Sequence, residues 1–394
     1  MFEIDLPPLE SAEPWRLPLS ERLQMLRAEP VKVAYYYHHP DAATFRYRCY
    51  NMARAINAHV PGVSASWFWD ADGARLLDVA KEVDVLVLCR AVYRDTTAQV
   101  VDAARRFGAC VFYDIDDLYF DPASIPLMVD TLGLREDSHE ATEEMWTHRF
   151  GTAARHRAVM EMADEVIVTN DYLAGQVRER LPQPVRVIPN FMGDDQLAVS
   201  EAVVAARGEP RADGRLHLGY FSGTPTHSRD FALVAGAMAR LLRRREDVAL
   251  RLVGHIDLGC TVLADFADRV EVVPYVGYLE LQRVIGQTEV NIAPLQNNSF
   301  TNCKSELKYF DAAAVGIPTL ASPTFAMSRA IDHERTGLLV PDPEWDHYLD
   351  LIVDEYNTLG RSLGQVARNH ALTTYTPTTQ APTIAALIDP NPGG

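Results

Sequence analysis

Four aspartates stand close together in the segment DIDDLYFDP (114–122), directly after an apolar run that is typical of a strand. Four carboxylates cannot all be buried as ions without partners. Three interpretations are open. The segment could chelate a metal and, through it, a diphosphate; it could orient an acceptor hydroxyl, with one carboxylate as a base; or it could be a solvated turn that caps a helix. Asp116 and Asp117 are the candidates for acceptor-side catalysis.

The segment GYFSGTPTHSRDF (219–231) combines a strand, a glycine turn and the start of a helix. Backbone N–H groups at such a helix start attract anions, and Gly223 lets a phosphate approach closely. Thr224 and Thr226 add hydroxyl donors, and Arg229 adds a positive charge. The pattern is compatible with a phosphate site, and spacing alone does not decide. The alternative is an ordinary turn whose Ser and Thr cap the helix, and the GxxxxGK[ST] phosphate loop is absent.

A third group of polar residues lies in NNSFTNCKSELKYFDAAAVGIPTLAS (297–322). We predict a helix from Lys304 to Val315, closed by Gly316 and Pro318. Lys304 and Lys308 are four residues apart and share one helical face, with Asp311 on the same helix. These charges either meet an anionic ligand or face solvent on an amphipathic helix.

Two histidines and two arginines follow the first predicted strand, in HHPDAATFRYR (38–48). At the carboxyl edge of a sheet, His38 and His39 are candidates for ligand contact and catalysis, and Arg46 and Arg48 for acceptor binding. The alternative is a structural or surface role. No other paired spacing completes a histidine metal site.

Strands and helices alternate along the chain in a way that positions these groups. Two series of short apolar strands, each followed by helical segments, predict an α/β fold with two parallel sheets. Ligands of such sheets bind outside the carboxyl ends of the strands, so two facing sheets would form a cleft. We expect an N-terminal arm (1–30) with a helix at 20–28, a first Rossmann-like domain (31–190), a linker (191–214), a second Rossmann-like domain (215–375) and a C-terminal tail (376–394).

Composition limits the possible partners. The 394-residue chain carries 54 acidic and 37 basic residues, a net charge of −17. Binding to nucleic acid, or strong attachment to an anionic membrane, is therefore not expected. The five cysteines are odd in number and lack a CxxC motif, which favours reduced thiols in the cytoplasm. The N-terminus does not read as a secretory signal, and no apolar run is long enough to span a bilayer.

Read together, the second and third segments resemble a known family. SG-T-x-H-x-R-D-F followed by K-S-x-L-K-Y-F-D-A-A-A-x-G-I-P is similar to the second half of the retaining GT-B glycosyltransferases of group 1. The resemblance spans about 216–340 and extends to 31–190. Asp311 takes the place of the second Glu of the family's E-x7-E pattern, and Gly316 and Pro318 match its end. Cys303 stands where the first Glu belongs, with Glu306 three positions out of register.

The resemblance implies roles for individual residues. Asp311 would hold the nucleotide ribose; Arg229 and Lys304 or Lys308 would bind the diphosphate; the loop VPYVGYLEL (273–281) would pack on the base. The family's His-Asp pair matches the place of Asp116 and Asp117. The full set expected on the donor side is Gly223, Thr224, His227, Arg229, Val276, Tyr278, Lys304, Ser305, Glu306, Lys308 and Asp311.

The implied activity is transfer of a hexose from a nucleotide diphosphate sugar to a hydroxyl of a glycan, glycoconjugate or small molecule, with retention of configuration. No obligatory metal or other cofactor is expected, because the helix dipole and basic side chains can neutralise the leaving diphosphate. The closing helix near 343–374 is expected to cross back to the first domain. The alternatives are a metal-dependent transferase built on the DIDD segment, a catalytically silent nucleotide-sugar-binding partner, and a GT-B-fold sugar-nucleotide epimerase.

Overall fold

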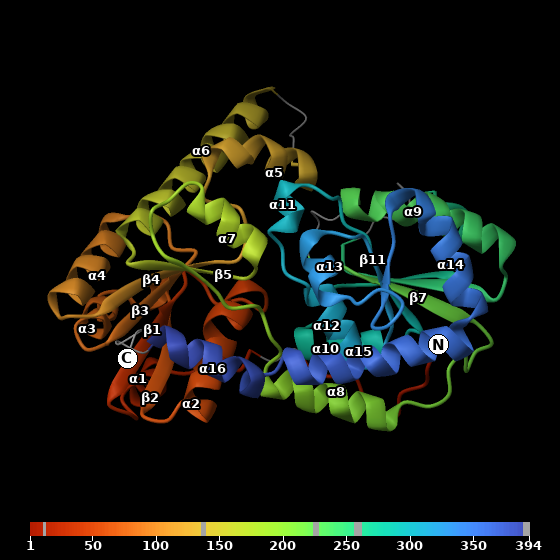
Figure 1. Ribbon diagram of the computed structural model, residues 1–394, viewed down its shortest axis with the longest axis horizontal. Helices are drawn as coiled ribbons and strands as arrows, with labels where there is room; N and C mark the ends of the chain where they lie inside the picture. Colours follow the sequence, from red (N-terminus) through yellow and green to blue (C-terminus); the bar gives the residue numbers. More distant parts are fainter. Residues whose placement is uncertain (11–12, 135–138, 224–227, 256–261, 389–394) are drawn as a thin grey trace.

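The computed structural model describes residues 1–10, 13–134, 139–223, 228–255 and 262–388, and contains two six-stranded parallel sheets, one in each half of the chain (Figure 1). Strands such as Val85–Cys89 and Leu216–Phe221 are buried along their whole length because helices cover both faces of each sheet. The predicted pair of Rossmann-like domains facing across a cleft is confirmed.

The N-terminal sheet has the strand order β2-β1-β3-β4-β5-β6. Its strands are β1 Val31–Tyr36, β2 Val63–Phe68, β3 Val85–Cys89, β4 Cys110–Ile115, β5 Glu165–Val168 and β6 Val185–Val187. The accompanying helices are α1 Leu19–Leu26, α2 Asn51–His59, α3 Arg75–Ala80, α4 Asp95–Arg106, α5 Ile125–Leu132, α6 His139–Met162 and α7 Asp171–Arg178.

The C-terminal sheet has the order β12-β11-β10-β7-β8-β9. Its strands are β7 Leu216–Phe221, β8 Val248–Val253, β9 Val270–Val273, β10 Val290–Ala293, β11 Thr319–Ala321 and β12 Leu338–Leu339. The remaining helices are α8 Asp194–Ala206, α9 Ser228–Arg244, α10 Tyr278–Gly286, α11 Ser299–Asn302, α12 Leu307–Ala314, α13 Phe325–Ala330, α14 Trp345–Asp354, α15 Arg361–Thr374 and α16 Pro377–Ile388.

Three local expectations need correction. Residues 194–206 of the expected linker form helix α8, which packs on α10. Helix α12 begins at Leu307 and not at Lys304. The carbonyl groups of Asn302, Cys303 and Lys304, before this helix, accept hydrogen bonds from a side chain of the other domain.

The third correction concerns the C-terminus. The helix expected over 343–374 is divided into α14, a π-helical turn at Tyr356–Gly360, and α15, which stays on the C-terminal domain against α12. The crossing back is made by α16, within the expected tail, which packs on α2 of the N-terminal domain (Figure 1). The chain crosses at Tyr375, whose ring lies 4.9 Å from that of Phe310.

The N-terminal arm also contacts both domains. The backbone N–H of Phe2 donates to Gln287 in the C-terminal domain (2.8 Å), whereas α1 packs on β2 in the N-terminal domain. Between them, fully buried Trp15 packs against Tyr50 of the first domain and Tyr278 of the second. The arm and α16 therefore join the domains at two places outside the cleft.

The docking of α16 can be tested at Ile384, which is fully buried. We expect Ile384→Ala to lower the free energy of unfolding by about 2–5 kcal/mol, because it removes buried methyl groups and leaves a cavity. Thr383→Ala, at an exposed neighbouring position, should change it by less than about 0.5 kcal/mol. Urea unfolding measures both variants. Equal stability of the two would mean that α16 does not pack as described.

Candidate functional site: a cavity between the domains

A cavity of about 200 Å³ lies between the two domains, with residues of both in its wall. The N-terminal domain contributes the loop after β1 and the aspartates after β4, and the C-terminal domain contributes the segment before and within α12. The lining residues are Ala43, Thr44, Tyr47, Asp116, Asp117, Asn190, Leu295, Lys304, Ser305, Leu307, Lys308 and Met327. Five of the predicted site residues are thus brought together: Asp116, Asp117, Lys304, Ser305 and Lys308.

Asp116 lies at the centre of the N-terminal wall. Its carboxylate accepts hydrogen bonds from Thr44 Oγ1 (2.9 Å) and from the guanidinium of Arg90, which forms an ion pair with it. Burial raises the pKa of Asp116, but Arg90 and Thr44 outweigh burial and leave this pKa below its ordinary value. Asp116 is therefore ionised at neutral pH.

Each of the four aspartates at the end of β4 and in the segment after it has a cationic partner, so none is buried as a lone ion. Asp114 lies within β4, and the other three follow it. The four cationic side chains come from four different segments, and one of them, Lys304, belongs to the C-terminal domain. The pairs are Asp114 with Arg48 (2.8 Å), Asp116 with Arg90, Asp117 with Lys304 (3.4 Å) and Asp121 with Arg180 (2.6 Å). This pairing satisfies the electrostatic requirement that the sequence raised.

Two lysines form the C-terminal wall. Burial opposes the charge of Lys304, yet the carboxylate of Asp117 raises its pKa. Within the described residues, Lys308 forms no ion pair: it donates to the carbonyl oxygen of Phe221, at the end of β7. Burial lowers its pKa to about 8, although the more distant carboxylates of Asp230 and Asp311 act in the opposite direction. Its ammonium group therefore lies beside the turn at Gly223, which is exposed.

Two asparagines of the N-terminal domain hold the segment that carries these lysines. Asn170 Oδ1 accepts from the backbone N–H of Leu173 (2.9 Å) and caps α7, while its Nδ2 lies 3.0 Å from the carbonyl oxygen of Lys304 and 3.2 Å from that of Cys303. Asn190 Nδ2 donates to Ser305 Oγ (3.0 Å). One domain thus fixes the backbone of the other at the cavity.

Asp311 lies behind the cavity wall, at the domain interface. Its Oδ1 accepts from Gln196 Nε2 of α8 (2.6 Å), and burial raises its pKa to about 6. Gln196 in turn accepts from Arg46 Nη1 (2.8 Å), and the Arg46 guanidinium stacks on Tyr278, 4.5 Å from the ring centroid. Asp311, Arg46 and Tyr278 are thus linked in one interdomain cluster. Their expected contacts with the ribose, the acceptor and the base, respectively, stay predictions.

The other predicted residues occupy several places. His38 and His39 lie in the loop between β1 and Thr44 and are exposed to solvent. Partial desolvation of the His38 ring lowers its pKa, so this imidazole is mainly neutral at pH 7. Arg229 pairs with Asp130 (2.9 Å) at the end of α5. The remaining positions are Arg48, buried against Asp114; Glu306, buried next to Tyr375; and Val276, half-buried on the C-terminal core. Thr224 and His227 lie outside the described residues.

Sequence reasoning missed Arg90, Thr44, Asn170 and Asn190. A signal was present for three of them: Arg90 follows the apolar run 84–89, and Asn170 and Asn190 end the runs 165–170 and 185–190, at positions comparable to that of the DIDD segment. Arg90 also has a left-handed backbone (φ 45°), which is unusual for a residue other than glycine. Its ion pair with Asp116 compensates for this local strain.

Comparisons with solved structures establish the fold. The chain is similar to a sucrose-phosphate synthase from Thermosynechococcus elongatus (TM-score 0.57, 16% identity, 90% of this chain and 97% of that one). It is similar to Anabaena HepE in complex with UDP and glucose, with a TM-score of 0.58, 11% identity and coverage of 90% of this chain and 98% of that one. It is also similar to a glycosyltransferase from Rickettsia africae, with a TM-score of 0.61, 12% identity and coverage of 91% of this chain and 98% of that one. The chain has the GT-B fold of these proteins.

A family model also matches the sequence of the C-terminal domain. Residues 216–354 match the model of the glycosyl transferases group 1 family, which confirms the resemblance drawn from the motifs of this domain. No curated protein sequence matches the chain. Within the described ranges, no helix is long and apolar enough to cross a membrane, and no group of three or more His, Cys, Asp or Glu side chains is placed to hold a metal ion.

Asn170 caps α7 and also donates hydrogen bonds to the other domain, and a variant can separate these two functions. Asn170→Ser keeps an N-cap side chain for α7 but removes the amide that reaches residues 302–304. We expect backbone amides of residues 299–306 to exchange hydrogen about twofold to tenfold faster, the effect of one ordinary hydrogen bond. Hydrogen exchange followed by mass spectrometry measures this. Unchanged exchange in this segment, with α7 also unchanged, would contradict the proposed hold.

Proposed function

We propose that this protein transfers a hexose from a nucleotide diphosphate sugar to an acceptor hydroxyl in the cavity between its domains, with retention of configuration. The observation that carries the proposal is the meeting of Asp116 and Asp117 with Lys304 and Lys308 in one cavity. The group 1 match of residues 216–354 and the GT-B fold support it. We place the reaction in the cytoplasm, in the synthesis of a polysaccharide or glycoconjugate.

The donor would bind mainly to the C-terminal wall. Lys308 is the best placed group for the diphosphate, because its ammonium lies next to the end of β7 and, among the described residues, donates to a carbonyl oxygen and not to a carboxylate. Lys304 would add a second charge if it turned from Asp117 toward the ligand. HepE is described with UDP and glucose, so uridine diphosphate sugars are the first donors to test.

The reaction would join the acceptor oxygen to the anomeric carbon while the bond from that carbon to the diphosphate breaks. Positive charge that develops at the anomeric carbon would be stabilised by ionised Asp116. The lowered pKa of Asp116 makes its carboxylate a weak base. Neutral His38, which follows β1 at the same carboxyl edge of the sheet, is therefore the better candidate to receive the acceptor proton. The diphosphate would depart toward Lys308.

The aspartates support a metal-independent reaction. A metal site in the DIDD segment would need free carboxylate oxygens. Here the carboxylates of Asp114, Asp116 and Asp117 already face Arg48, Arg90 and Lys304. A divalent cation would have to displace these side chains and leave their charges unpaired, at considerable cost. We therefore expect activity to survive a chelator.

Binding of UDP should depend on the protonation of Lys308. Its pKa of about 8 in the free protein would rise when a diphosphate binds, because the charged form then gains a partner. Affinity should be constant at pH values below about 8 and should fall as pH rises above it, by up to about tenfold per pH unit. Calorimetry between pH 7 and 9.5 measures this.

Lys308→Met should bind UDP more weakly at pH 7 and should lose this pH dependence. Lys81→Met, at an exposed position far from the cavity, should behave as the parent protein does. The same fall of affinity above pH 8 in Lys308→Met would contradict the assignment of Lys308 to the diphosphate.

Asp116→Asn tests the chemical step. We expect kcat to fall by about 10²–10³-fold, because the variant lacks the negative charge beside the anomeric carbon, while UDP affinity stays within about twofold. Asp84→Asn, at the opposite end of the sheet, serves as the control. Full activity of Asp116→Asn would remove this residue from the mechanism and direct attention to His38 and His39.

Two other activities are distinguished by the same assays. Buried Cys303, at the position of the family's first Glu, donates to the carbonyl of Ser299 (3.2 Å) and supplies no carboxylate, which favours a catalytically silent binding protein as the second candidate. That candidate would bind a donor without turnover across a wide acceptor panel. An epimerase would convert the donor with no acceptor present. A transferase yields a new glycoside, whose anomeric configuration NMR compares with that of the donor.

A further inference from the structure

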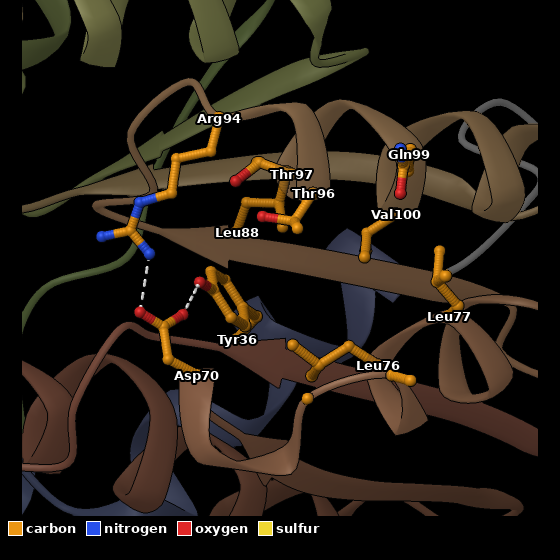
Figure 2. Close-up of a pocket in the computed structure, with 12 residues that line it drawn as sticks. Tyr36, Asp70, Leu76, Leu77, Leu88, Arg94, Thr96, Thr97, Gln99 and Val100 are labelled. Carbon is orange, nitrogen blue, oxygen red and sulfur yellow. Dashed lines mark hydrogen bonds and ion pairs between the residues drawn. The ribbon is translucent and has the colours of Figure 1, made fainter.

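A second, larger cavity of about 510 Å³ opens in the N-terminal domain between α3 and α4 (Figure 2). Its volume lies in the range of small-molecule sites. It is separate from the interdomain cavity, and no motif of the sequence pointed to it. We call it the α3–α4 pocket; its wall contains Tyr36, Asp70, Gly73, Ala74, Leu76, Leu77, Leu88, Arg94, Thr96, Thr97, Gln99 and Val100.

One end of this pocket is polar but electrically balanced. The Tyr36 hydroxyl donates to Asp70, and Arg94 Nη1 donates to the other oxygen of the same carboxylate (2.7 Å; Figure 2). Because the Asp70 and Arg94 charges cancel, this end favours an uncharged ligand. Thr96 also lines the pocket, and its hydroxyl adds a donor and an acceptor.

The other end is apolar. Leu76 and Leu77 of α3 lie opposite Val100 of α4, with Leu88 of β3 between them and the polar end (Figure 2). A ligand that fills the whole pocket therefore has an apolar part at the Leu76–Leu77 end and a hydroxyl-bearing part at the Asp70–Arg94 end.

The position of the polar end connects it with the interdomain cavity. Tyr36, Asp70 and Arg94 follow or end β1, β2 and β3, at the carboxyl edge of the sheet. The loop that leaves Tyr36 passes His38 and His39 and reaches Thr44, which donates to Asp116 (2.9 Å). One short loop thus connects the mouth of the α3–α4 pocket to the carboxylate proposed to face the anomeric carbon.

From this geometry we infer that the α3–α4 pocket binds the apolar part of an uncharged acceptor whose hydroxyl-bearing head extends along the loop of His38 and His39 toward Asp116. The acceptor class is an amphipathic glycoside or alcohol, an alkyl or aryl group that carries hydroxyls. This assignment rests on the proposed function for its direction, since only a transferase needs an acceptor hydroxyl at Asp116.

The apolar part can be tested by direct binding, without turnover. Methyl, butyl and hexyl β-glucosides are titrated into the full-length protein by calorimetry. Affinity should increase with chain length, by roughly threefold to fourfold for each methylene that enters the pocket. Equal affinity for the methyl and hexyl compounds would overturn the inference.

Variants then locate the binding site. Gln99→Trp and Ala74→Trp place an indole in the pocket from the α4 and α3 walls, at positions that are exposed to solvent. Both variants should bind hexyl glucoside at least tenfold more weakly than the parent protein, and their affinity for UDP should be unchanged. Arg106→Trp, on an exposed position of α4 outside the pocket, should bind hexyl glucoside as the parent does. Parent-like binding by both pocket variants would also overturn the inference.

Turnover separates this inference from the proposed function. With an active donor, hexyl glucoside should have a lower KM than methyl glucoside, and Gln99→Trp should erase that difference without changing donor KM. If no donor is turned over while binding still depends on chain length and on Gln99, the transferase proposal fails and the pocket stands as an apolar ligand site. If transfer occurs with a KM independent of chain length, the transferase stands and the acceptor role of the pocket is overturned.

Discussion

The arrangement of the site depends on the neutralisation of four carboxylates at the end of one strand. Asp114, Asp116, Asp117 and Asp121 lie where a low dielectric makes an unpaired charge very costly. Their cations come from the π-helical turn before α2, the end of β3, the segment before α12 and the end of α7. Because one of these segments belongs to the C-terminal domain, charge balance in the first domain also orients the second.

The domains are therefore joined at the site as well as outside it. Asn170 holds three consecutive carbonyl groups of the other domain, and Asn190 holds Ser305 beside them. Away from the cavity, Trp15 of the N-terminal arm and helix α16 also connect the two domains. These contacts hold the two domains together around the cavity, so a ligand bound there would meet groups of both domains; for the proposed transfer, this would also limit access of water.

The fold could be predicted from the sequence to a large extent, because each buried strand is an apolar run whose length and spacing are local properties. Lys304, Lys308, Asp116 and Asp117 were found because they follow strands or match a motif. Arg90 and Asn170 were not, since their functions depend on partners 26 and more than 130 residues away. The same long-range contacts lie where the helix start was predicted: Asn170 donates to carbonyl groups of residues 302–304, and α12 begins after them, at Leu307.

The most direct test of the central claim is a crystal structure of the protein with UDP bound. The account predicts diphosphate oxygens within hydrogen-bonding distance of Lys308 Nζ, in the cavity that Asp116 and Asp117 face, with Lys308 drawn away from the carbonyl of Phe221. A nucleotide bound elsewhere, with Lys308 still donating to Phe221 and the cavity without ligand, would contradict it.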